Sequence, residues 1–237
     1  MNQGVQVIQQ DVLSDNVNLE NTMDYSNVNS KKYAYRFVKR SFDLVLSTIG
    51  LLFLLPVVII VKIINICSGD FGRVFFTQDR IGKKGETFKF FKFRSMIPDA
   101  DKVLEELLNS DPAAREEYEL NKKLKNDPRI TKAGRFLRHY SLDELPQLIN
   151  IFLGQMSFIG NRPYLPREKE DMGMYYYSIV STKPGLTGYW QVSGRSDLSF
   201  QKRLQLEKYY SEHCSLKMDI KIFFKTFKVV LFGKGSM

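Results

Sequence analysis

The longest apolar stretch of the chain runs from Leu44 to Val61, eighteen residues without a charged side chain. At about 1.5 Å per residue, a helix of this length measures about 27 Å, close to the hydrocarbon thickness of a bilayer. Ser41 and Asp43 precede the run and suit the start of a helix. Pro56 interrupts it, and a proline inside a helix removes a backbone hydrogen bond. The pattern predicts a membrane-associated helical segment with a break near Pro56.

Basic residues flank this run on both sides. Those before it are Lys31, Lys32, Arg36, Lys39 and Arg40, and those after it include Lys62, Arg73, Arg80, Lys83 and Lys84. A single span would carry one cluster across the membrane, against the positive-inside tendency. A helix that breaks and returns keeps both clusters in the cytoplasm, and each half is too short to cross alone. We therefore favour a re-entrant helix-break-helix over residues 34–67, with a single span and a buried core helix as the alternatives.

The remaining pattern, residues 68–237, predicts a cytoplasmic catalytic domain. Aromatic and apolar residues around a Gly- and Lys-rich turn at 73–96 predict a β-hairpin. Prolines at 98 and 112 open predicted helices that end near 109 and 125, and another helix is expected from about 145 to 153. Two helices close the chain, the last a Lys- and Phe-rich amphipathic helix over 216–232 that suits a membrane surface.

The predicted fold class is α+β and mainly helical. It combines an N-terminal re-entrant membrane hairpin with a compact domain that contains a small β-hairpin or sheet and amphipathic surface helices. Residues 1–33 form a predicted disordered acidic tail, because the first thirty residues contain four acidic and no basic side chains and few large apolar ones.

The overall charge requires an anionic partner. The formal net charge is +9 with a pI near 9.4, which fits nucleic acid, phosphorylated small molecules or anionic lipid. The two cysteines, Cys67 and Cys214, match no disulfide framework or zinc spacing.

Two adjacent acids, Asp143 and Glu144, stand between a basic segment and an apolar helix. Ser141 and Glu144 have the spacing of a capping box, which would give these acids a purely structural role. Alternatively, the helix N-terminus and nearby arginines keep both carboxylates ionised. An ionised carboxylate can attack phosphorus or bind a hard cation such as Mg²⁺. Arg162, in a GNRP turn, could grip a phosphate.

Several segments together carry a family resemblance. They are KRSFDLVLS, the proline-interrupted apolar run, FTQDRIGKKGETFKFFKFRSM, DPRITKAGRFLRHYSLDELPQLINIFLGQMSFIGNRP and KPGLTGYWQVSGR. From about residue 34 to the C-terminus, the chain resembles the bacterial sugar transferase family, the monotopic polyprenyl-phosphate phosphoglycosyl transferases.

The resemblance implies a reaction and a place for it. The enzyme would transfer a sugar 1-phosphate, from a UDP-sugar carrying galactose or glucose, to undecaprenyl phosphate and release UMP. This step would begin the assembly of an exopolysaccharide, capsule, O-antigen or glycoconjugate. The protein would be monotopic, on the cytoplasmic face of the bacterial inner membrane in contact with its lipids, without a nucleic-acid partner. Neither the exact sugar nor an oligomeric state follows from the sequence.

The resemblance also implies roles for individual residues. Asp143 would be the nucleophile that forms a phosphosugar-aspartate, and Glu144 would hold Mg²⁺. Arg162 would bind phosphate. Beside the resemblance, Arg80 in the DRIGKKG turn is a phosphate-binding candidate, and Arg94, Arg138 and Arg195 are further candidates. Two positions depart from the family pattern, since Leu55 replaces a common serine before Pro56 and Glu207 replaces a common aspartate without an assigned role.

Two alternatives remain open at the level of sequence. Asp143 could act as a general base in a direct transfer, without a covalent intermediate. The chain could also be a non-catalytic basic protein that binds a membrane surface or nucleic acid, since its lysines are interleaved with aromatic residues.

Overall fold

The computed structural model describes residues 33–69, 71–121, 124–194 and 198–231. The predicted acidic tail thus lies outside the described residues, apart from Tyr33. The chain divides into two units, residues 1–36 and 37–237. Of the first unit only Tyr33 to Arg36 are described, as the beginning of helix α2 (Tyr33–Cys67). The described fold is mainly helical with two small two-stranded sheets, as predicted.

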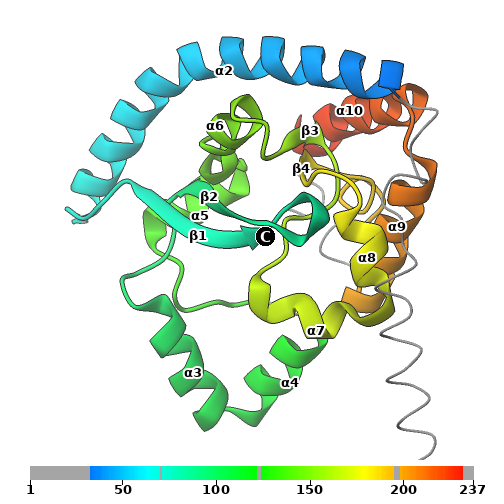
Figure 1. Cartoon of the computed structure of the whole chain (residues 1–237). Helices are drawn as coiled ribbons and strands as arrows, with labels where there is room; N and C mark the ends of the chain where they lie inside the picture. The colour runs from blue at the N-terminus through cyan, green and yellow to red at the C-terminus, as the bar shows by residue number, and fades with distance from the viewer. Residues whose placement is uncertain (1–32, 70, 122–123, 195–197, 232–237) are drawn as a thin grey trace, which may run out of the picture. The chain divides into compact units, whose positions relative to one another are not determined.

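Helix α2 continues through Pro56, so the structure does not contain the predicted break. Ser41 and Asp43, expected at a helix start, lie inside this helix. Its axis bends along its length (Figure 1), as proline-containing helices commonly do. Leu54 and Val61, on either side of the proline, are buried in one apolar cluster. The burial of both residues stabilises the continuous helix and offsets the hydrogen bond lost at Pro56.

Polar contacts fasten α2 to the domain along much of its length. The Asp43 carboxylate accepts the Ser157 hydroxyl at 3.0 Å and the Phe158 N–H at 2.9 Å. Arg40 donates to the Ile151 carbonyl at 2.6 Å. The polar Asp43, Ser47 and Asn65 are buried, whereas most large apolar side chains of α2 are exposed. The helix therefore turns its polar residues inward, the opposite of a helix on a water-soluble surface.

The predicted β-hairpin is confirmed. Strands β1 (Phe75–Ile81) and β2 (Thr87–Phe93) pair antiparallel, from Phe75 opposite Phe93 to Ile81 opposite Thr87. The turn contains the short helix η2 (Lys83–Gly85), where Lys84 has a φ of 60° and Gly85 a φ of 82°. A left-handed backbone at two successive residues closes the hairpin, and glycine adopts it readily.

The middle of the chain is helical. Helices α3 (Ala100–Ser110) and α4 (Pro112–Asn121) confirm the two proline-initiated predictions. Helix α5 (Lys132–His139) is capped by Thr131, whose hydroxyl accepts the Gly134 backbone N–H at 2.8 Å. It leads into the short helix η3 (Leu142–Glu144) and then α6 (Gln147–Phe152). The hairpin, α5 and α6 lie together on one side of α2, with α3 and α4 farther away (Figure 1).

The C-terminal part contains a small parallel sheet and the two predicted closing helices. Strand β3 (Ser157–Ile159) pairs with β4 (Gly185–Thr187). Between them lie η4 (Pro166–Glu168), α7 (Lys169–Met172), η5 (Gly173–Tyr175) and α8 (Tyr176–Val180). Helices α9 (Phe200–His213) and α10 (Leu216–Leu231) follow. The ring centres of Phe42 and Phe223 lie 5.7 Å apart, which places α10 against α2 (Figure 1).

Asp43→Ala is expected to destabilise the protein by about 1–3 kcal/mol, because the Ser157 hydroxyl and the Phe158 N–H would lose a buried acceptor. Thermal unfolding in detergent micelles measures the change. Thr48→Ala is the matched control, since Thr48 is exposed on the same helix and bonds only to the Leu44 carbonyl within that helix. Equal melting temperatures for the two variants would contradict this anchoring role.

Candidate active site

A small cavity lies where the β-hairpin meets the loops that follow β3 and β4. Its lining contains three basic side chains and one acidic side chain. The lining residues are Arg80, Phe90, Lys92, Glu144, Gln147, Arg162, Pro163, Gly185, Leu186, Trp190 and Gln191. The excess of positive charge favours an anionic ligand.

Glu144 lines this cavity, and Asp143 lies next to it in contact with a lysine that also lines the cavity. Asp143, only 5% exposed, belongs to η3 with Glu144. Lys92 Nζ lies 3.6 Å from Asp143 Oδ2 and 3.2 Å from Glu144 Oε1. Asp143 does not itself line the cavity, whereas Lys92 and Glu144 do. Burial raises the pKa of Asp143, and the charge of Lys92 opposes that rise.

The capping-box explanation of these acids is wrong. Ser141 precedes η3 but has a left-handed backbone with a φ of 55° and makes no capping hydrogen bond through its side chain. A helix cap therefore does not account for the two acids. Their ion-pair partner Lys92 comes from β2, about fifty residues away in the sequence.

A buried asparagine holds the lysine strand beside the acids. Asn150 of α6 accepts the Phe91 N–H at 3.1 Å and donates to the Lys89 carbonyl at 2.7 Å. These bonds bridge α6 to β2 immediately before Lys92. Because α6 follows η3 directly, they fix the distance between the lysine and the two carboxylates.

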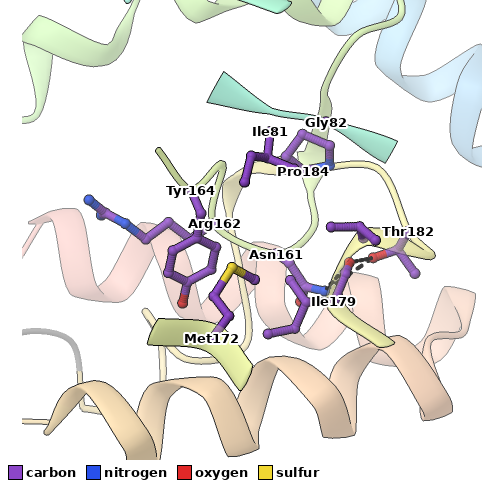
Figure 2. Close-up of a pocket in the computed structure, with 10 residues that line it drawn as sticks. Ile81, Gly82, Asn161, Arg162, Tyr164, Met172, Ile179, Thr182 and Pro184 are labelled. Carbon is purple, nitrogen blue, oxygen red and sulfur yellow. Dashed lines mark hydrogen bonds between the residues drawn. The ribbon is translucent and has the colours of Figure 1, made fainter. Parts of the chain in front are cut away.

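Arg80 and Arg162 reach the cavity from β1 and from the loop after β3. Arg80 donates to the Pro163 carbonyl at 3.1 Å. Burial and then the nearby charge of Arg162 lower the pKa of Arg80 to about 10. In Figure 2 the Arg162 side chain points away from Ile179 and Thr182, which line a neighbouring, more apolar pocket. The structure thus brings Arg80, Arg162 and Glu144 together at one cavity, and their roles in binding stay predictions.

Two of the other predicted arginines, Arg94 and Arg138, do not line the cavity. Arg138 donates to the Ser95 hydroxyl at 2.9 Å, and its pKa is lowered by burial while Asp143 opposes that change. It therefore lies near Asp143 but outside the cavity. Arg94 donates to the Arg73 carbonyl at 2.8 Å. Arg195 lies outside the described residues.

Sequence reasoning missed Lys92, Gln147 and Trp190 as site residues. Lys92 carried a usable signal, because alternation along β2 places it on the same face as Phe88 and Phe90. Gln147 and Trp190 are 2% and 8% exposed. They showed no comparable signal, because their burial results from tertiary packing.

Four buried N–H groups of the cavity have no hydrogen-bond partner in the described structure. They are Arg80 Nε, Gln147 Nε2, Arg162 Nε and Trp190 Nε1. Buried polar groups are normally paired, so such a group needs an explanation. All four are donors, and a ligand rich in oxygen acceptors, such as a sugar phosphate, would satisfy them.

The acidic pair fits one manner of binding Mg²⁺. Among the described residues, no three or more His, Cys, Asp or Glu side chains gather as a metal site. Mg²⁺ commonly uses one or two protein carboxylates, with water and substrate phosphates as the other ligands. Lys92 Nζ lies within 3.6 Å of both acids, so the two carboxylates face a shared position. Glu144 lines the cavity itself and is the acid that a metal bound there with substrate phosphates would meet.

A family profile and individual relatives of the chain point to the same protein family. Residues 34–233 match the profile of the bacterial sugar transferase family. The "UDP-galactose-lipid carrier transferase" of Erwinia amylovora is 45% identical over 212 residues, which are 88% of this chain and 43% of the relative. The "Undecaprenyl-phosphate galactose phosphotransferase" of Salmonella typhimurium is 45% identical over 213 residues, with shares of 88% and 43%.

A shorter relative is matched over most of its length. The "Exopolysaccharide production protein ExoY" of Sinorhizobium fredii is 43% identical over 200 residues, which are 84% of this chain and 87% of the relative. The chain thus spans less than half of the Erwinia and Salmonella proteins but most of the Sinorhizobium protein. Because the family profile also covers most of the chain, the protein belongs to the bacterial sugar transferase family.

Proposed function

We propose that the protein transfers a hexose 1-phosphate from a UDP-sugar to undecaprenyl phosphate, as the first step of assembling a bacterial exopolysaccharide or related glycan. The observation that carries this proposal is the buried Asp143 beside Glu144 at a basic, donor-lined cavity. The names of the Erwinia and Salmonella relatives support galactose as the sugar. An Escherichia coli relative, 36% identical, is named a "UDP-glucose:undecaprenyl-phosphate glucose-1-phosphate transferase", which supports glucose.

The proposed chemistry has two steps. An Asp143 carboxylate oxygen forms a bond to the sugar-bearing phosphorus, while the bond from that phosphorus to the bridging oxygen breaks. UMP leaves with the bonding electron pair. A phosphate oxygen of the lipid then attacks the same phosphorus and releases the carboxylate. Covalent catalysis lets the soluble donor and the lipid acceptor use the site in turn.

The surrounding charges support both steps. Attack requires an ionised Asp143, and Lys92 and Arg138 both favour that form. Arg80 and Arg162 line the cavity, where their charges would offset those of the donor pyrophosphate. We propose Glu144 as the Mg²⁺ ligand, and a bound Mg²⁺ would supply further positive charge to the departing UMP phosphate.

An exposed apolar surface supports a position on the membrane. Among the described helices, α2 alone is long and apolar enough to cross a bilayer. Yet it contacts the domain at Asp43, Leu54 and Lys62, which favours a helix held on one side of the membrane. The exposed apolar side chains of α2 and α10 include Leu52, Phe53, Leu55, Ile59, Ile60, Ile63, Ile220, Phe224 and Phe227. We propose that this surface enters the cytoplasmic leaflet of the inner membrane.

Asp143→Asn should abolish release of UMP, with a loss of at least about a thousandfold. Purified protein is mixed with Mg²⁺ and UDP-galactose or UDP-glucose without acceptor, and UMP is followed by rapid quench. The unchanged protein should release one UMP per active site. Asp79→Asn is the matched control, because Asp79 pairs with Lys89 on the exposed side of the hairpin.

Two outcomes would contradict this proposal. UMP release that requires undecaprenyl phosphate from the first turnover would favour direct transfer with Asp143 as a general base. No UMP with any UDP-sugar, with or without acceptor, would favour a non-catalytic basic protein.

Replacing Phe224 and Phe227 with Asp should weaken membrane binding by about tenfold or more per residue, since each aromatic side chain would lose its burial in lipid. Flotation with phosphatidylglycerol-containing vesicles after detergent removal measures the bound fraction. Leu120→Asp, at an exposed apolar position on α4, is the control. Unchanged flotation of the double variant would show that α10 does not contact lipid.

A further inference from the structure

Glu207 is a buried acid outside the cavity that holds the loop carrying Arg162. Its side chain, on α9, is 0% exposed. One carboxylate oxygen accepts a hydrogen bond from the backbone N–H of Arg162 at 2.7 Å, and the other accepts one from the Tyr164 hydroxyl at 2.6 Å. Figure 2 shows the Tyr164 hydroxyl pointing toward a helix, while the Arg162 side chain extends in another direction. Both bonds therefore hold the loop and leave the guanidinium free to face the cavity.

The same helix makes a further contact with this loop. Asn161 donates to the Ser211 hydroxyl at 2.6 Å, one turn beyond Glu207 on α9. Two residues before Arg162, the backbone of Gly160 packs closely against that of Lys183. A Cβ on Gly160 would lie only 2.4 Å from the Lys183 carbonyl oxygen. The backbone around Arg162 is thus held from two sides, by α9 and by the segment that leads into β4.

Glu207 also supplies negative charge to a group of arginines. Arg203, one turn earlier on α9, lies over the Trp190 ring with its guanidinium carbon 4.6 Å from the ring centre. Burial and the charge of Arg162 lower the pKa of Arg203, and Glu207 opposes that change. Trp190 and Arg162 both line the cavity. The carboxylate therefore offsets the mutual repulsion of two arginines that stand at or behind the cavity wall.

We propose that Glu207 is a positioning residue for donor binding. Its carboxylate fixes the backbone of Arg162 and offsets the charges of Arg162 and Arg203, so that the guanidinium stays where the donor pyrophosphate binds. This inference rests on the proposed function and adds to it a determinant of donor affinity outside the cavity.

The inference gives a pH dependence with a definite sign. Burial raises the pKa of Glu207 to about 7, against the hydrogen bonds from Tyr164 and Arg162 and the charges of Arg162 and Arg203. Among the described residues, Tyr164, Arg162 and Arg203 are the charged or titratable groups that shift this pKa. As the pH falls through 7, Glu207 gains a proton and loses the charge that holds the arginines. Donor affinity should therefore be high above neutral pH and fall below it.

A single tryptophan allows donor binding to be measured without turnover. Trp190 is the only tryptophan of the chain and lines the cavity. UDP-galactose is titrated by Trp190 fluorescence between about pH 6 and pH 8 in the Asp143→Asn background, which prevents reaction. Glu207→Gln should weaken binding about tenfold at the upper pH and remove the pH dependence over this range. Glu212→Gln, an exposed acid on the same helix paired with Lys208, should leave both unchanged.

Two further variants separate positioning from general stability. If Glu207 acts through Arg162, Glu207→Gln should weaken binding no further once Arg162→Ala is present. Tyr164→Phe removes a hydrogen bond that lowers the pKa of Glu207, so the midpoint of the pH dependence should move upward. Tyr164→Phe leaves Glu207 in place, so it keeps the inference testable if Glu207→Gln does not fold. Additive effects with Arg162→Ala, or an unmoved midpoint, would overturn the inference.

Failure of the proposed function gives a different result. If the unsubstituted protein releases no UMP from any UDP-sugar, the transferase activity is refuted. Inorganic pyrophosphate then serves as the fluorescence probe at the upper pH. Weaker pyrophosphate binding by Glu207→Gln would support the positioning role. Equal affinities, or no Trp190 response in the unsubstituted protein, would overturn it.

Discussion

The contact of Lys92 with two adjacent carboxylates is the constraint on which the site depends. Asp143 is nearly buried, and a buried carboxylate stays ionised only with a compensating charge. Lys92 supplies that charge within 3.6 Å, and Asn150 fixes the lysine strand to the helix that follows the acids. The hairpin and helix α6 thus form a rigid support, and the arginines of the cavity surround it.

A second constraint joins this charged site to a lipid surface. Helix α2 buries Asp43, Ser47 and Asn65 against the domain and exposes most of its large apolar side chains. Lys39 of α2 pairs with Asp219 of α10 at 2.6 Å, and Asp219 accepts the Tyr210 hydroxyl of α9 at 2.7 Å. Because α9 also holds the Arg162 loop through Glu207, one helix contacts both the proposed lipid-binding elements and the cavity wall. The proposed transfer would need such an arrangement, since a soluble donor and a lipid acceptor would each have to bring a phosphate to Asp143.

Local patterns predicted much of the fold, and long-range packing accounts for the differences. The hairpin, the proline-initiated helices and α10 follow from residue alternation, prolines and amphipathic spacing. The sequence predicted a break at Pro56, but the helix is continuous there. Leu54 and Val61 are buried in one apolar cluster, a contact that the sequence pattern does not reveal. Of the residues singled out from the sequence, Arg80, Glu144 and Arg162 line one cavity, whereas Arg94 bonds to the Arg73 carbonyl. Glu207 had no predictable role, since its partners lie more than forty residues away in the sequence.

The most direct test of the proposed mechanism is the mass of the protein after incubation with Mg²⁺ and its UDP-hexose donor, without lipid acceptor. A covalent aspartate intermediate predicts the addition of one hexose phosphate, located on the peptide that contains Asp143. Undecaprenyl phosphate should then remove it. An unmodified protein that nevertheless forms the lipid product when both substrates are present would contradict the mechanism.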